Sequence, residues 1–428
     1  MIQYQYDRVG ETVWRKHLPS GLDVYVVSKP EYGKQFAFLA VHCGSMDVEI
    51  RSKSGVKECI PIGTAHYLEH KLFESEDGSV TDAFADNGAE DNAFTSADLT
   101  GYYFECNEKF EENLRLLLSL VSSSCFTEDS VQRERDIIAQ EICMEEDEPY
   151  SLLYYKVMKM LYSKHPIRER IAGTTETIGE ITEETLRKYY DAFYNPGNMV
   201  LCVAGNVDPE SVCKVADEVL LPKVMTAVRT EHGLGESLGA ELGYAEWNMP
   251  VSVPLFTIGV KGTPAKQGES LRQRFLAELA CDVLFGPSSE LYTRLYDEGL
   301  INGAFGGDYE FVPGAAYLLL SGESRDPMRV RDELVQEAER LFREGINEEL
   351  WGRLKRAAYG AMVRGLNSLE NVCIELAQTH FDGENYFTFP EIFQSIEKHD
   401  VEELLGEWCV WERIALAVVN PQKITQKE

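Results

Sequence analysis

The apolar run Met199-Val200-Leu201-Cys202-Val203-Ala204-Gly205-Asn206 and its later counterpart Leu416-Ala417-Val418-Val419-Asn420 decide the fold class of this chain. Each run is short, rich in small and β-branched apolar residues, and ends at an Asn, which is typical of a buried strand. The two runs close two successive series of strands and helices. The repeat is one of pattern rather than identity, and it indicates a duplicated domain.

The first series begins with strands expected at residues 21–27 and 36–43, followed by a strand at 101–106. Helices are expected over about 107–161, with Pro149 as a punctuation point. The second series repeats this order with strands at 253–260 and 314–320 and helices at 271–284, 329–342 and 348–366.

We therefore predict an α+β fold made of two similar α/β-sandwich halves. A chain of 428 residues is also too long for a single ordinary core. The first half is expected at 1–222 and the second at 251–428. Residues 223–250 are rich in Gly and polar side chains and are interpreted as a linker.

Composition excludes several classes of protein. A hydrophobic content of 44% fits a folded chain, and a formal charge of −31 disfavours binding to nucleic acid or to anionic membranes. The sequence has no apolar run of transmembrane length and no secretory signal at its start. Its ten cysteines form no Cys-x-x-Cys pair, as expected for reduced thiols in the cytoplasm.

The segment 64–74, which reads Thr-Ala-His-Tyr-Leu-Glu-His-Lys-Leu-Phe-Glu, predicts a helix with chemistry on one face. His66 and His70 are one turn apart, so both imidazoles can bind one Zn²⁺. Glu69 lies beside them and can handle the proton of a water molecule. The order is the reverse of the common His-Glu-x-x-His helix and matches the inverzincin signature.

A catalytic zinc needs a third protein ligand. Glu134 and Glu141 fall on one helical face two turns apart, so one can bind the metal while the other lies behind it. Glu145 lies one turn beyond Glu141, and spacing alone leaves both as candidates. The acidic run could equally be a solvated helix face, and a five-residue histidine motif can arise by chance.

Four stretches of the first half are specific when taken together. They are Gly21-Leu22-x-Val24-x-Val26, Ala65-His66-Tyr67-Leu68-Glu69-His70-x-Leu72-Phe73, Asn92-Ala93-Phe94-Thr95-Ser96-x-x-x-Thr100-x-Tyr102-Tyr103-Phe104 and Glu134-Arg135-x-Ile137-Ile138-x-x-Glu141. In these stretches the chain resembles the insulinase/pitrilysin family of zinc metallopeptidases, which includes the mitochondrial processing peptidase. The resemblance covers nearly the whole chain.

The resemblance implies a role for each motif residue. His66, His70 and Glu141 would ligate one Zn²⁺, Glu69 would be the general base, and Glu134 would orient a ligand. Members of the family form clamshells in which α+β halves enclose a chamber for unfolded peptides. Chains of about this length work as dimers, so this chain would be half of a clamshell.

The resemblance also implies a place for the substrate. Asn92 and Ala93 match a segment that runs beside the bound peptide in the family, although Asn92 alone could be a turn residue.

One family feature is missing. Active relatives carry an Arg and a Tyr in the pattern Ser-x-Leu-x-x-x-Leu-Arg-x-x-x-Gly-Leu-x-Tyr, which bind the substrate carbonyl as it becomes an oxyanion. Here the stretch 289–302 is one residue shorter than the family pattern before the Gly. Counting from Ser289 places Tyr296 at the position of the Arg, and counting from Gly299 places Leu295 there. Asn302 takes the position of the Tyr. Arg294 would point about 200° away from Tyr296 on a helix.

The sequence thus predicts a cytoplasmic zinc endopeptidase subunit that acts on peptides or unfolded segments. A paralogous partner would supply the missing Arg and Tyr, because losing one oxyanion donor can cost about 10²–10³ in rate. A homodimer is a second possible assembly, but it would not supply these residues. Two other interpretations are a structural subunit that keeps the peptidase fold without chemistry and a chamber that captures peptides without cleaving them.

Overall fold

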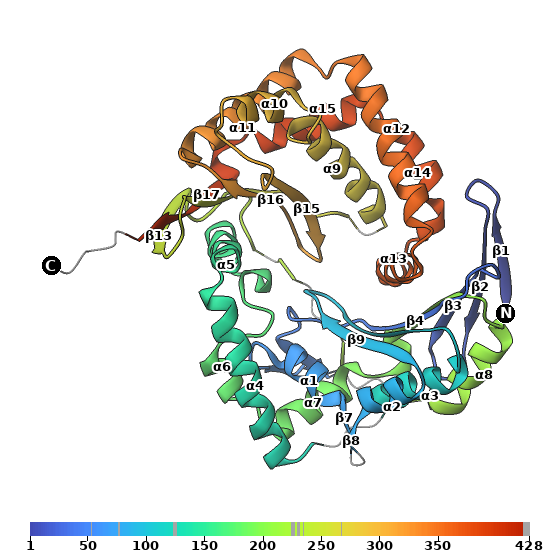
Figure 1. Cartoon of the computed structure of the whole chain (residues 1–428). Helices are drawn as coiled ribbons and strands as arrows, with labels where there is room; N and C mark the ends of the chain where they lie inside the picture. The colour runs from blue at the N-terminus through green and yellow to red at the C-terminus, as the bar shows by residue number, and fades with distance from the viewer. Residues whose placement is uncertain are drawn as a thin grey trace. The chain divides into compact units, whose positions relative to one another are not determined.

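The computed structural model describes residues 1–52, 54–75, 78–122, 126–223, 227–228, 232–233, 235–266 and 268–422. The chain forms two compact units (Figure 1). The first comprises Met1–Ile142, Arg170–Thr230 and Met362–Pro390. The second comprises Cys143–Glu169, Glu231–Ala361 and Glu391–Glu428.

A seven-stranded sheet forms the centre of the first unit, in the order β1-β2-β3-β11-β4-β10-β9. The strands are β1 (Ile2–Tyr6), β2 (Glu11–His17), β3 (Asp23–Ser28), β4 (Gln35–Val41), β9 (Ala89–Thr95), β10 (Thr100–Cys106) and β11 (Met199–Gly205). β3 and β11 pair in parallel, and the other neighbours are antiparallel. β9 pairs only with β10 among the described strands, so one of its edges is left open.

Helices cover both faces of this sheet. One face packs on α1 (Thr64–Leu72), α2 (Val80–Asp86) and α3 (Phe110–Ser122). The same apolar core also includes buried residues of α4 (Glu128–Asp147), α7 (Glu183–Phe193) and α8 (Pro209–Val219). The other face packs on α13 (Leu369–Phe381), which contacts β4 and β11. The unit also holds the short strands β5 (Glu49–Ser52), β6 (Lys57–Cys59) and β12 (Ala227–Val228), which form a small sheet.

The second unit has a five-stranded sheet in the order β13-β17-β14-β16-β15. Its strands are β13 (Tyr244–Met249), β14 (Leu255–Lys261), β15 (Gly306–Val312), β16 (Ala315–Glu323) and β17 (Ile414–Pro421). Its helices include α5 (Pro149–Leu161), α9 (Ser270–Leu284), α10 (Glu290–Asp297), α11 (Pro327–Glu344), α12 (Glu348–Gly365), α14 (Phe389–Ser395) and α15 (Lys398–Trp408). α5 contacts β14 and β17.

The expected duplication of an α+β domain is confirmed in the order of the strands. β9-β10-β4-β11 in the first unit corresponds to β15-β16-β14-β17 in the second, with the last strand of each series at the predicted closing run. One helix of each half belongs to the other unit, since α13 packs on β4 and β11 while α5 packs on β14 and β17. The two halves exchange one helix each.

The division into 1–222, a linker and 251–428 differs from these units because of the exchange. Residues 143–169 belong to the second unit and 362–390 to the first. Part of the expected linker is the strand β13, which pairs in parallel with β17. Residues 224–226, 229–231 and 234 of that stretch lie outside the described residues.

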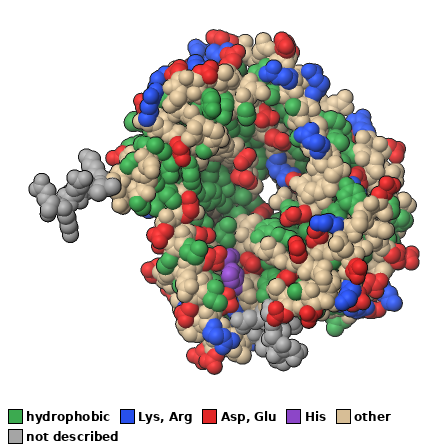
Figure 2. All heavy atoms as spheres, viewed as in Figure 1, with side chains coloured by type: hydrophobic (Ala, Val, Ile, Leu, Met, Phe, Trp, Pro, Cys, Tyr) green, Lys and Arg blue, Asp and Glu red, His purple; other side chains and the backbone are tan. Residues whose placement is uncertain are grey.

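The surface of the face shown in Figure 2 carries Asp and Glu side chains scattered among Lys and Arg rather than gathered in one block. No helix of the described chain is long and apolar enough to cross a membrane.

Candidate metal centre

Helix α1 is held in place at its N-terminal end and along its buried face. Gly63 caps it with φ 96°, and a Cβ atom there would lie 2.5 Å from the carbonyl oxygen of Ala172, so only glycine fits. Thr64 Oγ1 donates to the carbonyl oxygen of Pro61 at 2.7 Å. In the middle of the helix, the buried hydroxyl of Tyr67 donates to the carbonyl oxygen of Val131 in α4. This bond ties the histidine helix to the glutamate helix.

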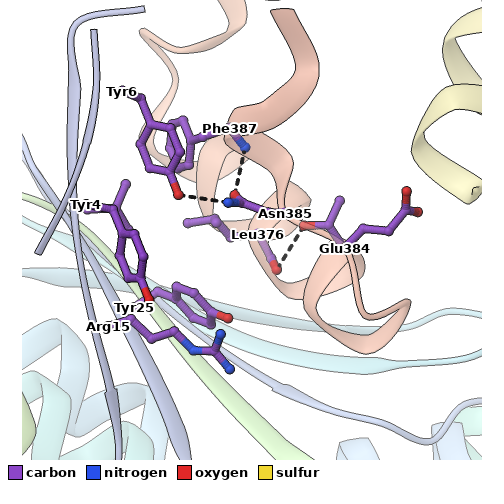
Figure 3. A pocket seen from close by; sticks show the side chains of 10 residues that line it. Tyr4, Tyr6, Arg15, Tyr25, Leu376, Glu384, Asn385 and Phe387 are labelled. Atoms are coloured by element: carbon purple, nitrogen blue, oxygen red, sulfur yellow. Dashed lines mark hydrogen bonds between the residues drawn. The ribbon is translucent and has the colours of Figure 1, made fainter. Parts of the chain in front are cut away.

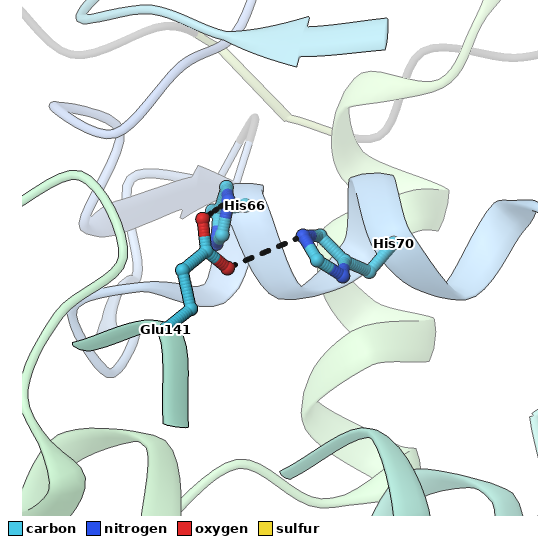
Figure 4. A group of neighbouring side chains, drawn as sticks. All are labelled: His66, His70 and Glu141. Carbon is cyan, nitrogen blue, oxygen red and sulfur yellow. Dashed lines mark ion pairs between the residues drawn. The ribbon is translucent and has the colours of Figure 1, made fainter. Parts of the chain in front are cut away.

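His66, His70 and Glu141 converge on one point (Figure 4). His66 Nε2 lies 3.7 Å from Glu141 Oε1, and His70 Nε2 lies 3.7 Å from Glu141 Oε2. One ligand atom from each residue lies within 4.8 Å of the others, and in the described part of the chain no other group of three His, Cys, Asp or Glu does so. The Glu141 side chain is 41% exposed, so the cluster is open on one side.

Two imidazoles, one carboxylate and an open side form the donor set of a catalytic zinc. The residues therefore fit the metal. Glu145, which spacing alone left as a rival of Glu141, is not a member of this group.

Glu134 lies behind His70. Its Oε1 is 2.9 Å from His70 Nδ1, an arrangement that leaves Nε2 to face Glu141. Burial by itself lowers the pKa of His70, but this hydrogen bond and the charges of Glu69, Glu134 and Glu141 outweigh it and raise the pKa. Burial likewise favours a higher pKa for Glu134, but the bond to His70 lowers it.

His66 has the opposite balance. Burial, followed by the neighbouring charge of His70, lowers the pKa of His66 to about 4. Its ring is therefore neutral near pH 7, which is the form that binds a metal.

Glu69 is buried next to the histidines and faces the sheet. Its Oε2 accepts a hydrogen bond of 3.0 Å from Thr95 Oγ1 at the end of β9. Burial raises the pKa of Glu69, while the charge of His70 and the bond to Thr95 act in the opposite direction. A carboxyl group with a raised pKa is suited to take up and release a proton.

The predicted substrate residues lie on the open edge strand β9. Asn92 is exposed, and its Oδ1 accepts a hydrogen bond of 2.8 Å from the backbone N–H of Ala93. The same strand carries Thr95, so one short element joins the predicted peptide edge to Glu69. Thr95 stands within the motif quoted for the resemblance, but sequence reasoning gave it no role.

The stretch that should carry the oxyanion donors lies in and after α10 of the second unit. Leu295 is fully buried, whereas Tyr296 is 52% exposed and stacks on Tyr292 with ring centroids 5.9 Å apart. Arg294 pairs with Glu333. Asn302 Nδ2 donates to Glu323 Oε2 at 2.7 Å. Neither position offers the expected Arg or Tyr.

A separate pocket of about 120 Å³ lies in the first unit between the strands at the β1 edge and the end of α13 (Figure 3). Asn385 Nδ2 donates to the hydroxyl of Tyr6 at 2.8 Å on its wall. None of the predicted site residues lines it.

The fold has two α+β units, and the site combines an inverted histidine helix with a glutamate from a second helix. This combination is typical of the inverzincin class of zinc metallopeptidases. Residues 35–175 match the model of the family described as insulinase (peptidase family M16), and residues 180–358 match the model described as the peptidase M16 inactive domain. The chain belongs to the insulinase peptidase family M16.

Individual relatives agree over the full length. A zinc protease of Bacillus subtilis, YmfH, is 32% identical over 98% of this chain and 99% of its own. A zinc protease of Mycobacterium tuberculosis is 25% identical, over 95% of this chain and 93% of its own. The crystal structure of an M16-like peptidase from Alicyclobacillus acidocaldarius is 28% identical, with a TM-score of 0.90, and covers 96% of this chain and 99% of that one.

Proposed function

We propose that this chain is the zinc-binding subunit of an endopeptidase that hydrolyses peptides or unfolded protein segments. The observation that carries the proposal is the convergence of His66, His70 and Glu141 beside Glu69. The zinc protease names of the relatives support the metal and the reaction class. The free thiols of the described cysteines support a reducing compartment, the cytoplasm.

The residues of the site would divide the work. His66, His70 and Glu141 would hold one Zn²⁺, which would supply Lewis-acid activation of a water molecule and of the peptide carbonyl. Glu69 takes a proton from the attacking water and passes it to the leaving amine as the C–N bond breaks. Glu134 keeps the His70 ring oriented through Nδ1.

The open edge of β9 would bind the substrate in an extended form. A peptide that adds to this edge gains main-chain hydrogen bonds without any demand on its sequence, which suits unfolded segments. Asn92 and Ala93 lie on this strand, three and two residues before its last residue, Thr95, which hydrogen-bonds to Glu69.

A paralogous subunit would supply the Arg and Tyr that this chain lacks. Support comes from the second unit, where Tyr296 and Asn302 occupy the matching stretch and Arg294 is paired with Glu333. A homodimer would lack the same Arg and Tyr in both of its chains.

A non-catalytic subunit that binds peptides or has a structural role is the second candidate. The lack of oxyanion donors favours it, and so does the description of the model that matches the second half as an inactive domain. The intact set of His66, Glu69, His70 and Glu141 favours catalysis instead.

The test is a comparison of wild-type protein with Glu69→Gln. We expect about one zinc per chain in both, and hydrolysis of an unfolded peptide by the wild type that rises when the paralogous chain is added. Glu69→Gln should lower turnover by about 10²–10⁴-fold, because it removes the general base and keeps the shape of the side chain. A wild-type chain without zinc, or one that binds peptide and never cleaves it even with the partner, would favour the second candidate.

A further inference from the structure

We propose that Thr95 is a positioning residue for the hydrolytic reaction, holding the Glu69 carboxylate in the direction of the reacting water. The inference rests on the proposed peptidase function and assigns a role to a residue outside the zinc ligands and the base. Among the described residues, Thr95 is the only side chain that hydrogen-bonds to Glu69, at 3.0 Å from Oγ1 to Oε2.

The bond is formed in a buried place. Thr95 and Glu69 are both buried, and water competes little with a hydrogen bond in such surroundings. A glutamate has three side-chain torsions, and a carboxylate with one oxygen tethered loses most of that freedom. With Oε2 bound to Thr95, Oε1 is left for the proton of the attacking water. The hydroxyl thus decides which oxygen acts.

Thr95 also links the base to the substrate edge. It is the last residue of β9, the strand whose free edge would bind the peptide, and it is paired in register with Thr100 of β10. A peptide added to β9 and the carboxylate of Glu69 would then be placed by the same strand. Misplacement of a reacting group by about 1 Å can cost roughly 10²-fold in rate. Because one strand positions both the peptide and the base, the loss of the Thr95 hydroxyl should lower the rate of hydrolysis.

The neighbouring Thr100 offers a matched control. It is fully buried directly opposite Thr95, but its Oγ1 donates to the carbonyl oxygen of Cys43 at 3.0 Å and not to Glu69. Thr95→Val and Thr100→Val each remove one buried hydroxyl of similar size from paired strands. A purely structural role predicts similar consequences for both variants.

The experiment measures kcat, KM, zinc content and thermal unfolding for the zinc-loaded protein, with its paralogous partner where the chain alone is slow. Thr95→Val should keep its zinc and its KM while kcat falls roughly 10- to 100-fold. Thr95→Ser retains the hydroxyl and should recover most of kcat. Thr100→Val should lower the unfolding temperature and leave kcat within about twofold of wild type.

Equal kcat losses in Thr95→Val and Thr100→Val, or no recovery in Thr95→Ser, would overturn the role of Thr95. A wild-type protein that cleaves nothing would count against the peptidase function and not against this inference. Crystal structures of the two valine variants test the inference without any activity. The Glu69 carboxylate should turn away from its wild-type position in Thr95→Val alone, and an unmoved carboxylate there would contradict the proposal.

Discussion

Helix α1 of the first unit and helix α9 of the second follow corresponding strands, β4 and β14, yet their buried faces differ in kind. The buried face of α1 includes Glu69 and Lys71. The buried face of α9 is made of apolar side chains such as Leu276, Leu279 and Val283. One architecture therefore serves two purposes, and the chemistry is set by side chains rather than by the fold.

The difference shows what a buried polar face requires. Two polar side chains of α1 meet partners from other elements, with Thr95 of β9 for Glu69 and Glu134 of α4 for His70. An unpartnered buried polar group would cost about 1–3 kcal/mol. The apolar face of α9 needs only close packing and no hydrogen-bond partners. A site of this kind can form only where three elements are fixed together.

The largest expected effect comes from breaking the helix exchange on which that fixed arrangement depends. A fragment of residues 1–222 lacks α13, which covers the β4 and β11 face of the first sheet. The buried Phe36, Phe38 and Val200 would become exposed, at a cost of about 1.5–3 kcal/mol for each side chain. We expect no cooperative unfolding transition and no stoichiometric zinc binding from this fragment.

The remaining residues, 223–428, provide the control. This second fragment carries α13 and lacks α5, so each fragment holds the helix that the other needs. Mixing the two should restore zinc binding and near-native circular dichroism. A fragment 1–222 that folds and binds zinc unaided would show that the exchanged helix is not required.

The next effect separates the zinc ligand from its neighbour on α4. Glu141→Gln removes a charged oxygen from the three-residue group, whereas Glu145→Gln changes an acid one turn away that is not a member of it. Glu141→Gln should weaken zinc binding by more than the roughly 10- to 100-fold that the loss of an outer partner costs. Glu145→Gln should bind zinc like wild type. Competition with a fluorescent chelator measures the zinc dissociation constant of both variants. Equal losses of affinity would contradict the assignment of Glu141 as the third ligand.

Much of the fold could be predicted from local pattern. The apolar runs at 199–206 and 416–420 became β11 and β17, and the predicted helix at 271–284 became α9 almost without change. The exchange of α5 and α13 could not be predicted from the sequence. The local sequence pattern predicts that each helix has an apolar face, but it does not indicate which of the two similar sheets that face will cover. The strand β13 was missed because its exposed and partly buried residues lie in a polar stretch.

The site was predictable where covalent spacing fixes geometry. His66, Glu69 and His70 share one short helix, so their mutual positions follow from the helical repeat. Glu141 and Glu145 differ by a single turn, and only the packing of α4 on α1 distinguishes them. Thr95 acts across a strand and a helix 26 residues apart in sequence, a contact that no local pattern encodes.

The smallest effect concerns a buried charged group of the second unit that lies outside the metal site. Glu236 has a side chain only 6% exposed, pairs with Lys261 at 3.1 Å and accepts hydrogen bonds from the backbone N–H groups of Ser163, Lys164 and His165. Burial alone would raise the pKa of Glu236, but these N–H groups and the Lys261 ammonium lower the pKa to about 2.

A folded-state pKa below the ordinary value of 4.5 means that the ionised carboxylate stabilises the protein above pH 4.5 and that this stabilisation is lost as the pH falls toward about 2. Glu236→Gln should therefore lower the free energy of unfolding by about 3 kcal/mol near pH 7, and less at about pH 3. Zinc binding should not change.

Glu290→Gln is the control. It removes an exposed partner of Arg340 in the same unit and should lower the free energy of unfolding by less than about 1 kcal/mol. Urea denaturation at both pH values measures these differences. If Glu236→Gln costs no more than Glu290→Gln, or costs the same at both pH values, the buried charge does not stabilise the second unit in this way.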